Sequence, residues 1–233
     1  MSVIKPHRYL SKEGIETQAN DLLLRMQGTP NYPKWPYVAD RAVNFLDLGV
    51  VLVSIPPHNG RPVFARIYPQ KRLIEINEDI PKLKEDRGLE QSTLAHEIGH
   101  WMLHVNQDEA DGFLEQLELP LGSDFTEEPF LCRSVSEQQI YQINANKQLE
   151  SREWQAQYFA SCLLMPRHIL EEKRKGRDLT NWRHLYAMRS DLGVTISNLK
   201  HRLQDLGWIN LSKDSQQIYL GKTPPNGQTS LFG

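Results

Sequence analysis

The sequence has few cysteines and no long apolar run. Only Cys132 and Cys162 occur among its 233 residues, so no disulfide framework is expected. No stretch approaches the ~20 consecutive apolar residues of a membrane span, and residues 1–6 lack the apolar core of a signal peptide. We therefore expect a cytoplasmic protein that has no membrane partner.

Internal repeats and long low-complexity segments are also missing. Charged residues make up 24% of the chain and hydrophobic residues 39%, which is ordinary for a globular protein. A chain of 233 residues suits one large domain, or one domain with an appendage, and can bury a sizeable core.

The most informative motif is His-Glu-Ile-Gly-His at residues 96–100. In a helix, His96 and His100 lie about 40° apart on one face, so both imidazoles can meet a single ion. Zinc binds neutral imidazole nitrogen, and a neighbouring carboxylate that is not a ligand can accept a proton from water. The motif therefore predicts a hydrolytic zinc site in which His96 and His100 bind the metal and Glu97 acts as the base.

The surroundings of the motif favour a helix. Residues 93–104 contain no proline and carry apolar residues near helical spacing. Gly99 costs roughly 1 kcal/mol relative to alanine inside a helix, so we expect another backbone element or the metal to approach closely there. The alternative is a helix with two surface or core histidines and no metal.

A third zinc ligand is expected from a second helix. Residues 148–164 read as a helix that stops before Pro166, because the residue preceding a proline disfavours the helical conformation. Glu153 shares a face of this helix with small and apolar residues, which would let it reach the metal. Gln157, one turn further on, could orient a ligand histidine.

Other residues compete for these roles. Glu150 is a second carboxylate on the same predicted helix, and an acidic residue at a helix start is often only a solvated charge. His104 lies eight residues beyond His96, about 12 Å along a straight helix, which is too far for both to bind one ion. We therefore expect His104 to be a structural or supporting histidine.

Two blocks of sequence, residues 96–104 and 153–166, resemble the ImmA/IrrE family of prokaryotic zinc metallopeptidases. The family signature pairs a zinc helix with an E-x-x-A-N-x-F-A-x-x-L-L-M-P helix, and the resemblance covers roughly residues 13 to 210. It implies that Glu153 is the third zinc ligand and that the substrate is a repressor protein cut at one site. Gln157 departs from the pattern, since the family more often has Asn or Asp there.

The region before the motif predicts helices at residues 13–26 and 38–48, followed by β-rich runs. These runs, at residues 50–54, 63–68 and 73–77, predict a small, mainly antiparallel sheet. Its last strand leads towards the motif helix, an arrangement in which an edge strand beside the site can pair with an extended peptide substrate.

Residues 105–132 contain eight acidic residues and no lysine or arginine. Glycines and prolines interrupt the segment, which therefore predicts a long connecting loop. We considered three roles for it: a solvated loop, a lid that favours a basic substrate segment, and a shield over the cleft until a partner binds.

Residues 167–222 have the opposite balance, with eleven basic and six acidic residues. Two predicted helices, 181–190 and 196–206, flank a turn, and a hairpin after Gly207 would complete a winged-helix outline. Candidate DNA contacts on the second helix are Asn198, Lys200, His201, Arg202 and Gln204. The alternative is that this unit packs on the core or docks a partner protein.

Together these observations predict an α+β fold: a zincin-like metallopeptidase core at residues 1–166, a helix-turn-helix-like module at 167–222 and a disordered tail at 223–233. Zn²⁺ would be held by His96, His100 and Glu153, with Glu97 as catalytic base and Gln157 beside the ligands. Two rival interpretations exist: a DNA- or protein-binding regulator whose zinc is structural or absent, and an antitoxin partner that keeps the fold without turnover.

Overall fold

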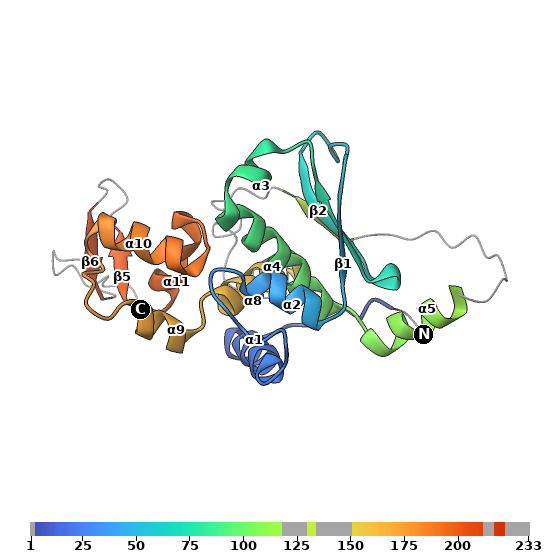
Figure 1. Cartoon of the computed structure of the whole chain (residues 1–233), viewed down its shortest axis with the longest axis horizontal. Helices are drawn as coiled ribbons and strands as arrows, with labels where there is room; N and C mark the ends of the chain where they lie inside the picture. Colours follow the sequence, from blue (N-terminus) through green and yellow to red (C-terminus); the bar gives the residue numbers. More distant parts are fainter. Residues whose placement is uncertain (1–2, 118–129, 134–150, 212–216, 222–233) are drawn as a thin grey trace, which may run out of the picture.

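The computed structural model describes residues 3–117, 130–133, 151–211 and 217–221, which form a mixed α+β fold (Figure 1). No helix in these ranges is long and apolar enough to cross a membrane. The helices are α1 (Lys12–Met26), α2 (Val38–Phe45), α3 (Pro81–Glu85), α4 (Arg87–His104), α5 (Gln107–Leu117), α8 (Arg152–Leu164), α9 (Arg167–Lys173), α10 (Trp182–Leu192) and α11 (Ile196–Asp205). The strands are β1 (Gly49–Val53), β2 (Val63–Tyr68), β3 (Leu73–Asn77), β4 (Phe130–Arg133), β5 (Ile209–Leu211) and β6 (Ile218–Leu220), with a short 3-10 helix, η1 (Pro69–Lys71).

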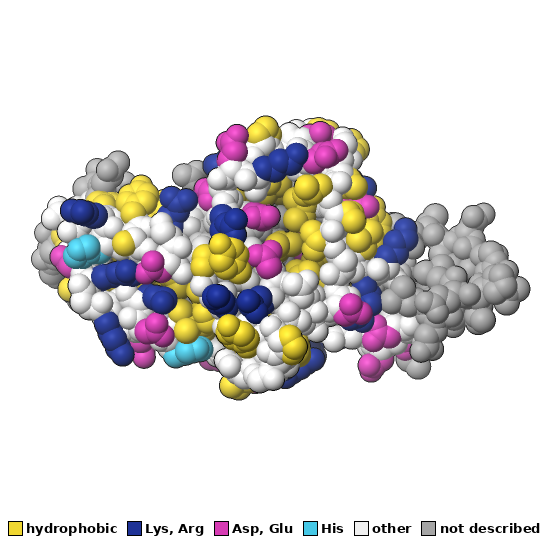
Figure 2. All heavy atoms as spheres, in the orientation of Figure 1, with side chains coloured by type: hydrophobic (Ala, Val, Ile, Leu, Met, Phe, Trp, Pro, Cys, Tyr) yellow, Lys and Arg dark blue, Asp and Glu magenta, His cyan; other side chains and the backbone are white. Residues whose placement is uncertain are grey.

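The larger sheet has the strand order β1-β3-β2-β4. Strands β2 and β3 pair antiparallel, as do β2 and β4, whereas β1 and β3 are parallel. The three predicted strands are thus present, and the sheet is small and mainly antiparallel, but it also contains β4, which was not predicted. On edge strand β1, Val50, Val51 and Leu52 are all exposed, and Figure 2 shows hydrophobic side chains gathered over the sheet.

Helix α4 runs through the centre of the fold and packs against α8, α2 and the sheet. It begins where the Asp86 carboxylate accepts hydrogen bonds from the backbone N–H groups of Gly88 and Leu89. Its middle, residues 91–101, is buried throughout, although six of these eleven residues are polar or charged. The histidine motif therefore lies in the buried part of this helix.

Helix α8 lies across α4 and ends at Leu164, just before Pro166, as predicted. A Cβ atom at Gly99 would lie only 2.7 Å from the carbonyl oxygen of Ala156, so the two helix backbones touch at this point. The prediction that Gly99 marks a close backbone approach is confirmed. This contact sets how near α8 comes to the histidines.

Part of the segment at 105–132 differs from its prediction as a loop. Residues Gln107–Leu117 form α5 and Phe130–Arg133 form β4, while residues 118–129 lie outside the described part of the chain. Two of the eight acidic residues that suggested a solvated loop, Asp108 and Glu109, lie in the first turn of α5, where the helix dipole favours negative charge. An ion pair between Arg72 and Asp111 joins α5 to the region of the sheet.

The elements predicted after Pro166 are also present. Gly193 ends α10 in the left-handed conformation with φ of 66°, Thr195 caps α11, and β5 and β6 pair antiparallel. The short helices α3 and α9 were not predicted. The tail at 223–233 lies outside the described residues.

Two of the candidate DNA contacts on α11 are wrong, because their side chains face the interior. Asn198 donates to the Ser92 hydroxyl on α4 at 2.7 Å. Arg202 is fully buried and donates to Glu16 on α1 at 2.7 Å and to the Met165 carbonyl at 3.2 Å. Their polarity suggested a solvent-facing surface, but their partners lie in the core, so α11 packs on the rest of the fold through this face.

Candidate metal centre

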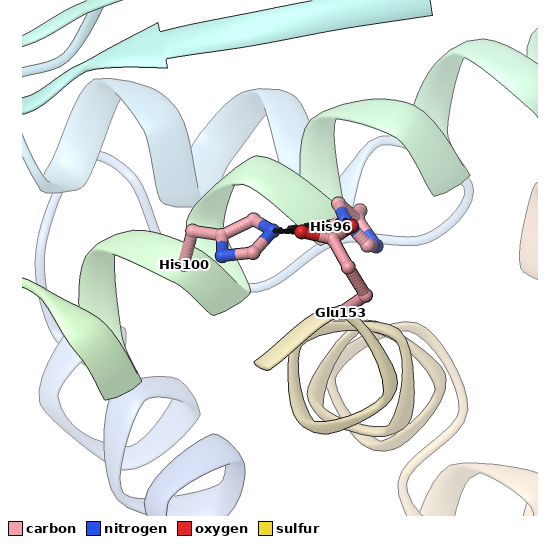
Figure 3. Close-up of side chains that lie close together, drawn as sticks. All are labelled: His96, His100 and Glu153. Atoms are coloured by element: carbon pink, nitrogen blue, oxygen red, sulfur yellow. Dashed lines mark hydrogen bonds and ion pairs between the residues drawn. The ribbon is translucent and has the colours of Figure 1, made fainter. Parts of the chain in front are cut away.

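Three potential metal ligands converge between α4 and α8 (Figure 3). The Nε2 atoms of His96 and His100, one turn apart on α4, lie 3.1 Å from each other. Glu153 rises from α8 and places Oε2 3.3 Å from His96 Nε2 and Oε1 3.4 Å from His100 Nε2. Glu153, at least 53 positions from either histidine in the sequence, thus points at the same small volume as they do.

The spacing of these atoms fits a zinc ion. Ligands at ~2.0–2.1 Å from a tetrahedral zinc lie roughly 3.3 Å from one another. The three gaps in the structure are 3.1, 3.3 and 3.4 Å. Glu153 Oε2 is also buried without a hydrogen-bond donor among the described residues, and a cation between the three groups would satisfy it.

The charge states of the three groups also suit a cation. Burial alone would raise the pKa of Glu153, but the adjacent imidazoles of His100 and His96 outweigh it and hold the pKa well below its usual value. Burial lowers the pKa of His100, against the opposing pull of Glu153. The carboxylate of the centre is therefore ionised, the form in which it binds a metal ion.

A neighbouring group orients each histidine. Gln157 Oε1 lies 3.2 Å from His96 Nδ1, and when it accepts that N–H, Nε2 is left as the lone-pair donor to the centre. His104 Nδ1 lies 3.1 Å from His100 Nδ1, on the side of the ring away from Glu153. His104 is thus a neighbour of the centre and not a member of it.

Sequence reasoning missed Gln155. Its Oε1 lies 2.9 Å from His104 Nε2, and its side-chain amide donates to the Arg8 carbonyl at 3.0 Å. The one local signal was a glutamine between Trp154 and Ala156, two small or apolar neighbours that are themselves buried. Its partners, 51 and 147 positions away, could be found only from the fold.

Glu97 lies on α4 between the two histidines and is fully buried, with both carboxyl oxygens inaccessible to solvent. Glu150, the competing carboxylate, lies outside the described residues. Among the described residues, Glu153 supplies the carboxylate of the cluster, and its side chain is 39% exposed while those of His96 and His100 are 6% and 0% exposed. Glu153 is therefore the most exposed of the three candidate ligands.

Two histidines from one helix and a carboxylate from another define a candidate single-metal centre in an α+β protein. The family model described as Peptidase_M78, the IrrE N-terminal-like domain, matches residues 131–204, a range that includes Glu153 but not the histidine motif. This match supports the assignment of the chain to the ImmA/IrrE family, which is a metallopeptidase family.

Among solved structures, a Mycobacterium tuberculosis transcriptional regulator is similar to this chain, with a TM-score of 0.46 and 14% sequence identity. The similarity covers 84% of this chain and 47% of that one, so the chain spans about half the length of that protein. Comparison with curated proteins gave no match.

Proposed function

We propose that the protein is a zinc-dependent metallopeptidase, with His96, His100 and Glu153 as the zinc ligands and Glu97 as the catalytic base. The convergence of three ligand atoms at 3.1 to 3.4 Å between α4 and α8 carries this proposal. In domain terms, residues 1–166 form the zincin-like core and residues 167–222 a helix-turn-helix-like module docked on it.

Zinc, when bound, supplies a Lewis acid that polarises the scissile carbonyl and acidifies water. The residues of the chain do the rest. His96 and His100 present unprotonated Nε2 atoms, and Gln157 holds the His96 ring in place. Glu97 accepts the proton of the attacking water and returns it to the leaving amine, a role that contributes ~10²–10⁴-fold to such reactions.

For the substrate, we propose an extended segment of a repressor protein. The repressor is inferred from the resemblance to the ImmA/IrrE family. The extended form is inferred from the sheet, because within the described part of the chain β4 is the edge strand that contacts α4, and a peptide can add to a sheet edge by backbone hydrogen bonds. Of the three proposed ligands, Glu153 has the most exposed side chain, so such a segment would reach the centre beside it.

A second candidate function is a zinc protein without turnover, such as an antitoxin partner or regulator. Gln157 bears on it, because its neutral amide contacts His96 at a position where the family more often has Asn or Asp, and compared with Asp it lacks the charge that would orient the ring more strongly. Direct DNA binding through α11 has weaker support, since Asn198 and Arg202 are buried. Lys200, His201 and Gln204 remain as partly exposed candidates.

The test combines metal analysis with cleavage. Purified wild type and Glu97→Gln should each contain one equivalent of zinc, while Glu153→Ala should lose it. Candidate repressors, chosen from genes next to that of the protein, are then incubated with each variant. We expect Glu97→Gln to cut at least ~10²-fold more slowly than wild type. Equal cleavage by both would refute Glu97 as the base, and zinc binding without cleavage of any candidate would favour the second function.

A further inference from the structure

A chain of hydrogen bonds leads away from His100 into the interior. His100 Nδ1 lies 3.1 Å from His104 Nδ1, and His104 Nε2 lies 2.9 Å from Gln155 Oε1. The Gln155 amide nitrogen then donates to the Arg8 backbone carbonyl at 3.0 Å. His100, His104 and Gln155 are 0%, 5% and 1% exposed, so solvent does not compete for these contacts.

The last acceptor fixes the direction of the two outer hydrogen bonds in the chain. A backbone carbonyl can only accept, so Gln155 turns its NH₂ group to Arg8 and its Oε1 to His104. His104 must then carry its proton on Nε2. A neutral imidazole with its proton on Nε2 carries a lone pair on Nδ1. That lone pair accepts from His100 Nδ1–H, and the His100 Nε2 that faces Glu153 is left unprotonated.

We propose that His104 and Gln155 are positioning residues that lock His100 in the Nδ1–H tautomer, so that its Nε2 lone pair is presented to the cation before the cation arrives. The proposal rests on the proposed function in so far as it takes the ligand to be a metal ion. His96 obtains the same tautomer from the single amide of Gln157, whereas His100 obtains it through two linked side chains.

The chain of hydrogen bonds from His100 through His104 and Gln155 to the Arg8 carbonyl is called the relay below. The N-terminal segment holds its far end in place. Lys5 N–H donates to the His104 carbonyl at 2.8 Å, and Asn106 N–H donates to the Val3 carbonyl at 2.8 Å. Arg152, in the first turn of α8, donates to the Lys5 carbonyl at 2.8 Å. Residues 3–8 thus join the end of α4 to the start of α8, and they hold the Arg8 carbonyl where Gln155 can reach it.

The relay predicts which substitutions at His104 matter. His104→Leu removes the acceptor for His100 Nδ1–H, so His100 becomes free to adopt the other tautomer. We expect zinc affinity to fall about 10- to 100-fold, the range seen when the outer partner of a ligand is lost. His104→Gln offers a carbonyl oxygen like that of Gln157 and should restore most of the affinity. Gln155→Met should weaken binding in the same direction as His104→Leu.

Leu103→Ala is the matched control. Leu103 is the neighbour of His104 on α4 and is 1% exposed, but it belongs to the apolar core and not to the relay. It should lower the melting temperature at least as much as His104→Leu does and leave zinc affinity unchanged. Zinc affinity is measured by competition with a chelator of known affinity, and folding by circular dichroism of each metal-free variant.

The tautomer itself is read from the ¹⁵N chemical shifts of histidine-labelled, metal-free full-length protein. The proposal requires a protonated Nδ1 and an unprotonated Nε2 on His100 in wild type and in Leu103→Ala, with this state lost in His104→Leu. An Nε2–H tautomer in wild type would overturn it, as would equal losses of zinc affinity in His104→Leu and Leu103→Ala. If wild type bound no zinc, the proposed function would fail, whereas the shifts would still decide the relay.

Discussion

The contact between Gly99 and Ala156 controls the candidate metal centre, and Gly99→Ala tests this directly. The new Cβ atom would lie 2.7 Å from the Ala156 carbonyl oxygen and 2.9 Å from its Cα. Non-bonded carbon contacts are normally about 3.5 Å or longer, so α8 has to move away from α4 by roughly 0.7 Å. Ala156 stands one turn after Glu153, and the carboxylate therefore moves with it.

Two opposing terms set the change in stability. Overpacking costs ~1–3 kcal/mol, while replacing glycine by alanine within a helix gains about 1 kcal/mol. The net loss is about 0–2 kcal/mol. The effect on the centre is larger, because gaps of 3.3 and 3.4 Å would widen by several tenths of an ångström. Metal sites tolerate deviations of only about 0.2 Å, so we expect zinc affinity to fall at least ~10-fold.

Gly112→Ala provides the control, since a Cβ at Gly112 in α5 would meet no atom within 4 Å. Gly112→Ala should therefore gain only the stability, about 1 kcal/mol, that alanine contributes over glycine within a helix. Thermal melts should therefore place Gly99→Ala below Gly112→Ala by about 1–3 kcal/mol, or ~2–12 °C. Chelator competition gives the zinc affinity of both variants. Wild-type zinc affinity in Gly99→Ala would refute the claim that this contact positions Glu153.

Two further predictions concern the contact between α11 and the core. Arg202→Met breaks a buried pair with Glu16 and should cost roughly 3 kcal/mol or more, whereas Lys200→Ala, at a partly exposed site, should cost under ~1 kcal/mol. Urea midpoints compare the two, and equal midpoints would contradict the role of Arg202. Burial raises the pKa of Glu16, but Arg167 and Arg202 lower it more, so the net pKa lies below its usual 4.5. The stability it contributes is full above that value and is lost as pH falls through the folded-state pKa. An acid urea series should therefore be flatter for Glu16→Gln than for wild type, and parallel curves would exclude this linkage.

The local features of the fold were predictable from the sequence. The helical spacing around His96, the stop before Pro166 and the β-rich runs at 50–54, 63–68 and 73–77 all act within a few residues, and each has its counterpart in α4, α8 or the sheet. Gly99 was informative for the same reason, because a glycine inside a helix has a local cost that a tertiary contact explains.

The failures involve partners that are distant in sequence. Asn198 and Arg202 suggested a DNA-facing surface because they are polar, yet Ser92 and Glu16 meet them in the interior. The acidic residues of α5 suggested a solvated loop because they are charged, yet Asp111 pairs with Arg72 from another part of the chain. Gln155 carried no periodic signal, and its role emerges only where α4, α8 and the N-terminal segment meet.

The division of the centre between α4 and α8 has a consequence for biosynthesis. A nascent chain that has emerged only as far as α4 displays two imidazoles without the carboxylate, and zinc held by two ligands is held weakly. On the proposed function, tight capture of the ion would await the emergence of Glu153, about two thirds of the way along the chain. Premature termination before that point would leave a product that cannot assemble the centre, whatever helical structure it forms.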